Sequence, residues 1–222
     1  MKSQQSGFTL VEIAIVLVII GLLLGGVLKG QELINSAKVK NIANDFRVIP
    51  TYIYAFQDKF KALPGDDSGV VNHVSGATLA TTPAGTIGNG VINGNWNSTT
   101  AADETVQFWA HVRHANLAAG STDLANMAEF EPRNSVGGRI GISSLSAGQP
   151  HITGMPGGSY QICSKAILGK FARQLDVQMD DGNTATGSMR TVLDTVAIGT
   201  AAPAMTATFP DESTTHTVCM VF

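Results

Sequence analysis

The residues with the clearest capacity for chemistry are oxygen-bearing side chains in the final third of the chain. Asp176, Asp180, Asp181 and Asn183 supply hard oxygen ligands around an Asp-Gly turn, and calcium prefers carboxylate and amide oxygens. Their spacing does not match a complete EF-hand loop, and Asp-Gly is by itself a favoured turn pair. The turn is therefore a candidate calcium site, with an ordinary turn as the alternative.

The five histidines also have metal-binding chemistry. His111 and His114 are three residues apart and could share a helix face, but no acidic residue or cysteine accompanies them at the spacing of zinc ligands. We interpret them as surface or packing residues, and we expect His73, His151 and His216 in loops. Because the sequence also lacks a nucleophile motif, a phosphate-binding loop and a zinc-protease helix, we do not expect an enzyme.

The chain has two cysteines, Cys163 and Cys219. Outside the cytoplasm we expect them to pair, and closing a loop of about 57 residues contributes roughly 4 kcal/mol in the chain-entropy model. Two buried free thiols are the alternative. A metal pair lacks further ligands at a suitable spacing.

An acidic residue, Glu12, lies inside an apolar segment near the N-terminus. It is the only residue between Phe8 and Leu28 that can carry a charge. The segment is about 21 residues long, or roughly 30 Å as a helix, which is enough to cross the hydrocarbon core of a bilayer. A carboxylate there costs on the order of 2–3 kcal/mol in lipid, so we expect Glu12 to have a partner of opposite charge.

The residues before this segment do not follow the order of a secretory signal. Residues 1–7 are polar, with Lys2 and the amino terminus as positive charges, and Gly7 precedes the apolar core. A secretory signal has its small residues after the apolar core. Cleavage after Gly7 would keep the apolar segment in the mature protein, whereas the alternative is an uncleaved N-terminal anchor.

The short basic leader, the letters G-F-T-L-V-E at 7–12 and the adjoining apolar segment resemble the N-terminus of the type IV pilin and type II secretion pseudopilin family. The resemblance implies that a prepilin peptidase cuts between Gly7 and Phe8 and methylates the new amino terminus at Phe8. It also implies that the carboxylate of Glu12 attracts the amino terminus of the next subunit during assembly. In this family a disulfide near the C-terminus often pins the last strands.

Charge is distributed unevenly along the chain. The net charge is -3, but the residues after position 62 include 7 basic and 13 acidic side chains, a net of -6. Phosphate contacts supply most non-specific affinity for nucleic acids, and an acidic domain repels them at long range. We therefore do not expect nucleic acid as a partner.

After residue 28 the apolar pattern becomes periodic. Steps of three and four predict that the helix continues to about residue 61 with one buried face. The residues of this face are Val39, Ile42, Phe46, Ile49, Ile53, Phe56 and Phe60. Pro50 falls inside it and is expected to kink the helix without breaking it. A linker rich in glycine and asparagine is expected from Leu63 to about Thr100.

The rest of the chain predicts an α+β fold, with a long N-terminal helix packed on a small antiparallel β-sheet head and extra short helices. The expected helices cover 103–119 and 164–175, and the expected strands cover 138–142, 159–163, 189–193, 205–209 and 217–221. The expected organisation is a leader (1–7), a transmembrane or filament-core helix (8–28), an amphipathic helix half (29–61) and a globular head (62–222).

These features predict a structural subunit of a type IV pilus-like filament. The resemblance implies a precursor in the bacterial inner membrane, with its head in the periplasm and later in an extracellular pilus or a periplasmic pseudopilus. Its expected partners are further copies of the chain, the prepilin peptidase and an assembly platform in the inner membrane. The alternatives are a pseudopilin of a type II secretion system, a minor pilin at a filament tip and a membrane-anchored binding domain that does not polymerise.

Overall fold

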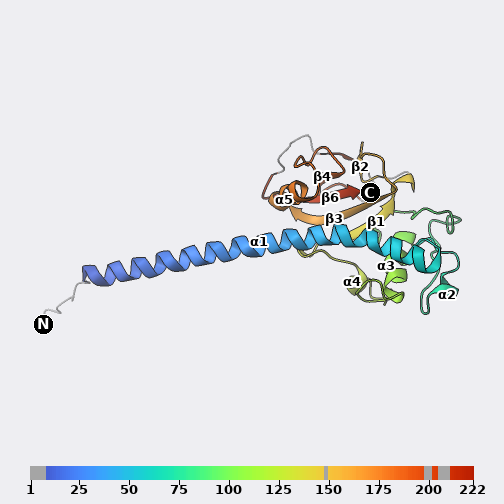
Figure 1. Ribbon diagram of the computed structural model, residues 1–222, viewed down its shortest axis with the longest axis horizontal. Helices are drawn as coiled ribbons and strands as arrows, with labels where there is room; N and C mark the ends of the chain where they lie inside the picture. Colours follow the sequence, from blue (N-terminus) through green and yellow to red (C-terminus); the bar gives the residue numbers. More distant parts are fainter. Residues whose placement is uncertain (1–8, 148–149, 198–201, 205–210) are drawn as a thin grey trace. The chain divides into compact units, whose positions relative to one another are not determined.

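The computed structural model describes residues 9–147, 150–197, 202–204 and 211–222. The chain forms two compact units, Met1–Lys38 and Val39–Phe222, which are described separately. The helices are α1 (Leu10–Phe60), α2 (Val70–His73), α3 (Glu104–His114), α4 (Met127–Phe130), the 3-10 turn η1 (Leu145–Ala147) and α5 (Gly169–Met179). The strands are β1 (Ile140–Ser144), β2 (Ile152–Thr153), β3 (Tyr160–Leu168), β4 (Met189–Leu193), β5 (Ala202–Pro203) and β6 (Thr215–Val221). The predicted α+β fold is confirmed (Figure 1).

The long helix α1 contributes the centre of the core of the second unit. The predicted apolar face is buried from Val39 to Phe56, and Phe60 is partly buried. The helix continues past Pro50, as predicted, and the Thr51 hydroxyl donates a hydrogen bond to the Val48 carbonyl at 2.6 Å. It ends where Lys61 adopts a positive φ of 55°, a conformation typical of the residue after a helix.

The head contains a four-stranded antiparallel sheet in the order β1-β3-β6-β4. Its apolar side chains share one core with α1 and α3, because Ile142, Ile162 and Val218 belong to the same buried cluster as Phe46 and Phe108. A second, two-stranded parallel sheet joins β2 and β5. The predicted strands at 138–142, 159–163, 189–193 and 217–221 correspond to β1, β3, β4 and β6, whereas the strand predicted at 205–209 lies outside the described residues.

The helix predicted at 164–175 is wrong in its first five residues. Residues up to Leu168 extend β3, and α5 begins at Gly169. Ile167 lies opposite His216 in the β3–β6 pair, after an irregularity in register that includes Ala166 with a positive φ of 61°. The apolar residues at 167 and 168 fit a helix or a strand equally well, so pairing with a distant strand decided their conformation.

The segment predicted as a linker between the long helix and residue 100 is part of the folded core. It contains α2, and the side chains of Val70, Val74 and Ile92 are buried in the main cluster. Its buried acidic residue Asp66 accepts hydrogen bonds from the backbone N–H groups of residues 88–90. Because side chains and backbone amides anchor it, the segment is a packed insertion instead of a tether.

Helix α3 begins one residue after Asp103, as predicted, but it ends at His114 instead of near residue 119. Asp103 occupies the N-cap position without a side-chain bond to the helix, because its carboxylate accepts hydrogen bonds from the hydroxyls of Thr82 and Ser98. All residues from Glu104 to Arg113 are buried. The helix is therefore enclosed on every side by the insertion, α1 and β1.

Candidate functional site

The first unit presents a continuous apolar surface. Within α1 the large side chains near the N-terminus are all exposed, among them Leu10 (91%), Leu22 (73%) and Leu28 (66%). By length and composition this helix can cross a membrane. Soluble monomers seldom expose apolar surfaces of this extent, so lipid or other protein helices are the environments that suit it.

Glu12 closes the first turn of α1. Its Oε2 accepts hydrogen bonds from the backbone N–H of Thr9 at 2.8 Å and from the Thr9 hydroxyl at 2.7 Å. The Glu12 N–H in turn points at the Thr9 hydroxyl oxygen at 3.3 Å. This reciprocal arrangement is a capping box, in which threonine and glutamate three residues apart satisfy otherwise unpaired N–H groups. Thr9 was not among the predicted site residues, although its spacing from Glu12 is that of a capping box.

The capping box uses one of the two carboxylate oxygens. Within the described residues, Glu12 Oε1 accepts no hydrogen bond, and the side chain is exposed. A carboxylate can accept hydrogen bonds at both oxygens, so Oε1 is available to a cationic group of another molecule. Gly7 and Phe8, the predicted processing residues, lie outside the described residues.

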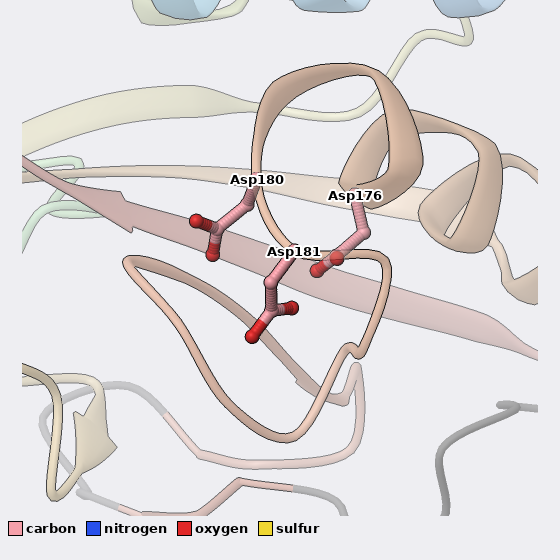
Figure 2. Close-up of side chains that lie close together, drawn as sticks. All are labelled: Asp176, Asp180 and Asp181. Carbon is pink, nitrogen blue, oxygen red and sulfur yellow. The ribbon is translucent and has the colours of Figure 1, made fainter.

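The structure brings together three of the four predicted calcium ligands. Asp176 lies in the last turn of α5, and Asp180 and Asp181 lie directly after it. Each presents a carboxylate oxygen within 4.8 Å of the others (Figure 2). The side-chain oxygen of Asn183 instead accepts a hydrogen bond from the N–H of Ala185, while its own N–H donates to Asp181.

Asp176 is the unusual member of this group. Its side chain is fully buried, and neither of its carboxylate oxygens has a hydrogen-bond partner among the described residues. Burial, with a smaller contribution from the charge of Asp181, raises the pKa of Asp176 to about 6. The N–H groups of residues 182 and 183 lie close enough to oppose this rise, although neither makes a hydrogen bond of full geometry with the carboxylate. Asp176 is therefore either protonated and neutral, or charged and in need of a compensating positive charge.

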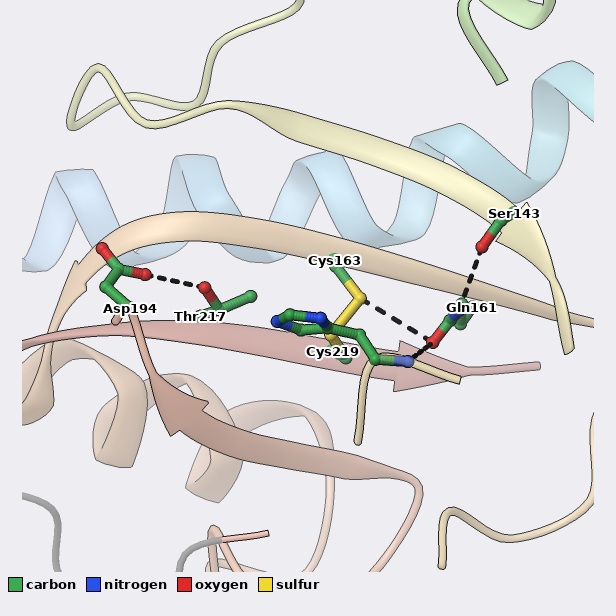
Figure 3. The surroundings of a disulfide bond; sticks show 7 residues. Ser143, Gln161, Cys163, Asp194, Thr217 and Cys219 are labelled. Carbon is green, nitrogen blue, oxygen red and sulfur yellow. Dashed lines mark hydrogen bonds between the residues drawn. A yellow bond between two sulfur atoms is a disulfide. The ribbon is translucent and has the colours of Figure 1, made fainter. Parts of the chain in front are cut away.

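The two cysteines form the predicted disulfide, Cys163–Cys219. They lie directly opposite each other on the neighbouring strands β3 and β6, and both are buried. Nearby, Gln161 accepts a hydrogen bond from the N–H of His151 at 3.0 Å and donates one to the Ser143 hydroxyl at 3.0 Å (Figure 3). The disulfide therefore joins the two central strands of the sheet, β3 and β6, next to the hydrogen bonds of Gln161.

The histidines serve packing, as predicted for His111. The Nδ1 atom of His111 accepts a hydrogen bond from the Gly65 N–H at 2.9 Å, and Nε2 lies 2.9 Å from the Thr78 carbonyl. Because Nδ1 is an acceptor, the proton is on Nε2 and the ring is neutral. Burial lowers its pKa to about 4. The expectation that His73 and His216 lie in loops is wrong, because His73 is the last residue of α2 and His216 is a buried residue of β6.

The second unit also has an open cleft of about 340 Å³ between α1, α3 and residues 129–133. Asp45, Glu129, Arg113 and Arg133 contribute side chains of both charges to it. Arg113 is occupied, since it donates hydrogen bonds to the carbonyls of Ser121 and Phe130. The mixture of charges favours no single class of ligand.

Comparison with known proteins adds one match. Residues 2–28 match the prokaryotic N-terminal methylation motif. No curated protein and no solved structure shows significant similarity to the chain. The motif and the exposed apolar helix together fit a membrane-anchored precursor.

The matched residues include the whole segment that carries Gly7, Phe8 and Glu12, and they stop where the amphipathic half of α1 begins. Proteins with this motif are generally structural and not catalytic. The N-terminal segment of this chain is therefore the signature of the type IV pilin and pseudopilin family.

Proposed function

We propose that this chain is the structural subunit of a type IV pilus-like filament. In this proposal a prepilin peptidase cuts the precursor between Gly7 and Phe8, and the new amino terminus at Phe8 is methylated. The observation that carries the proposal is the exposed apolar surface of α1 within the methylation motif. From residue 8 to residue 28, Glu12 is its one acidic or basic side chain.

The same apolar surface suits two environments in succession. In the precursor it spans the inner membrane, where lipid covers it. In the filament it packs against the equivalent helices of other copies, which removes the same area from lipid and water. The heads, residues 62–222, then form the periplasmic or extracellular part of each subunit.

Glu12 sets the register between subunits in this proposal. Its Oε2 is held by the capping box, while its Oε1 is directed to the positively charged amino terminus at Phe8 of a neighbouring copy. In a surrounding of low dielectric constant the attraction between these charges is strong at a few ångström. A copy shifted by one turn would leave both charges without a partner, which is costly.

The experiment measures N-terminal processing and filament formation in cells that produce this protein from a single gene. Mass spectrometry of the mature protein is expected to show N-methylated Phe8, and Gly7→Val is expected to remain a precursor because a side chain obstructs the protease. Electron microscopy of sheared material is expected to show filaments. Unprocessed, unmethylated protein in the membrane would contradict the proposal and favour a plain anchored domain.

A pseudopilin of a type II secretion system is the second candidate, because the methylation motif is common to pilins and pseudopilins. It predicts processing and methylation without long surface filaments, together with loss of protein secretion on deletion. A minor pilin at a filament tip predicts filaments in which this chain is a trace component. Quantitative immunoblotting of sheared filaments distinguishes the two from a major subunit.

A further inference from the structure

We propose that a second copy of this chain docks on the cleft beside α1, with Arg47 of one copy paired with Asp45 in the cleft of the next. The cleft is the open hollow of about 340 Å³ between α1, α3 and residues 129–133. The inference rests on the proposed filament function and deepens it, because it assigns a contact to the folded second unit in addition to the apolar segment of α1.

Asp45 is a carboxylate that its own chain leaves uncompensated. Its side chain is half-buried in the wall of the cleft, and among the described residues it has no hydrogen bond and no ion pair. Burial raises the pKa of Asp45 to about 6, because the charged form loses contact with water. The nearby cations are engaged elsewhere, since Arg113 donates to two carbonyls and Arg133 is paired with Glu131. A cation from another molecule would stabilise the charged form.

The rest of the lining is of the kind found between proteins. It contains the aromatic rings of Tyr52 and Trp109 together with charges of both signs. Interfaces between proteins are enriched in aromatic residues and arginine, and their rims are polar. A small ligand of one charge would meet groups that repel it, whereas a protein surface can present several different groups. Three acidic and two basic side chains line the cleft, so its net charge of -1 favours a basic surface.

The exposed side of α1 provides a basic surface of this kind. Lys40 and Arg47 are exposed, and neither has an ion pair among the described residues. They are seven residues apart, which is about two helical turns, so they lie on the same side of the helix. Tyr54 follows seven residues later and is 61% exposed. We call these three residues the basic stripe.

Asp45 and Arg47 cannot pair within one chain. They are two positions apart on a helix, which places them about 200° apart around its axis. Each charge can therefore meet its opposite only in another copy. A contact that joins two different patches of identical subunits is head-to-tail, and it builds a helical filament when it does not close into a ring. Contact of one cleft with another cleft would instead bring like charges together.

Charge reversal tests the pairing in the full chain produced in cells. Asp45→Lys alone and Arg47→Glu alone are each expected to lower the yield of sheared filaments at least about tenfold, because like charges then face each other. The chain with both substitutions has opposite charges again, and its yield is expected to return to within about threefold of the wild type. Lys59→Glu is the matched control, because Lys59 is also exposed on α1 but lies over the ring of Phe60 of its own chain. Its effect is expected to stay below about twofold.

Disulfide cross-linking tests the contact directly, including where a charge variant does not reach the membrane. The two native cysteines are bonded to each other, so no native thiol competes with introduced ones. Cells that produce an Asp45→Cys chain together with an epitope-tagged Arg47→Cys chain are expected to yield a cross-linked heterodimer after mild oxidation. Lys59→Cys in place of Arg47→Cys is expected to yield none.

Wild-type filaments without the cross-link between positions 45 and 47 overturn this inference and leave the proposed function standing. A doubly substituted chain that assembles no better than either single variant, at equal membrane levels and with equal processing, overturns it as well. So does a homodimer of Asp45→Cys in place of the heterodimer, because cleft would then face cleft. If the wild-type chain stays unprocessed and gives neither filaments nor cross-link, the proposed function fails together with this inference.

Discussion

The two roles of Glu12, capping its own helix and pairing with a neighbouring subunit, can be separated by substitution. Glu12→Gln keeps an oxygen that can accept from Thr9, since glutamine also occurs at this position of capping boxes, but it removes the negative charge. Thr9→Ala removes the hydroxyl bonded to Glu12 and keeps the charge. We expect Glu12→Gln to stop assembly and Thr9→Ala to preserve it.

The expected magnitudes differ enough to be measured. An ion pair at about 4 Å in a surrounding with an effective dielectric constant of about 20 contributes roughly 4 kcal/mol. At about 1.4 kcal/mol per factor of ten, its loss raises the subunit concentration needed for assembly on the order of a thousandfold. Loss of the Thr9 cap costs about 1 kcal/mol, and this cost falls on the helix terminus instead of on the contact between subunits.

The assay is a comparison of sheared filaments from cells that produce each variant at equal membrane levels. Immunoblots report processing, and electron microscopy reports filament number and length. Glu32→Gln is the control, because Glu32 lies on the same helix, is exposed and forms its ion pair with Lys29 of its own chain. Loss of the Glu32–Lys29 ion pair is expected to change filament number by less than about twofold, since exposed ion pairs contribute about 0–1 kcal/mol.

The reasoning is refuted if Glu12→Gln forms as many filaments as the wild type. It is also refuted if Thr9→Ala reduces assembly as strongly as Glu12→Gln, because Thr9→Ala keeps the charge of Glu12.

Three further predictions concern the second unit. Phe46→Ala, which empties a fully buried position on α1, is expected to destabilise the chain by about 3–5 kcal/mol in urea unfolding. Tyr54→Ala, at an exposed position of the same helix, should change stability by less than about 1 kcal/mol, and equal losses would contradict the packing described. Removing the Cys163–Cys219 bond, which links residues 56 positions apart, should cost roughly 4 kcal/mol, and unchanged unfolding after reduction would contradict that value. The pKa of His111 is lowered to about 4 in the fold, so the unfolded chain binds its proton first and stability falls as pH drops from about 6.5 to about 4. His111→Gln should reduce this dependence in unfolding measured over that range, and an unchanged slope would contradict it.

Much of the long helix α1 could be predicted because its properties depend on residues that are close together in sequence. The apolar segment, its single carboxylate and the methylation motif are all continuous in sequence. The buried face of α1 from Val39 to Phe56 follows from the helical period alone. The capping box could have been predicted as well, from the spacing of Thr9 and Glu12.

The head was predicted less completely. The anchoring of Asp66 to N–H groups at residues 88–90, and the enclosure of α3 by the insertion, depend on residues far apart in sequence. A segment rich in glycine and asparagine has the composition of a flexible linker, and only the buried side chains of Val70 and Ile92 show that it belongs to the core.

The sequence alone determined the family signature, the long helix and its buried face, because each is set by local periodicity or by contiguous residues. Only the tertiary structure decided the strand order, the division of 164–175 between β3 and α5, and the burial of Asp176. The physical reason is that these features depend on long-range contacts. Ile167 is extended because His216 lies opposite it, and Asp176 is buried because the folded head encloses its side chain.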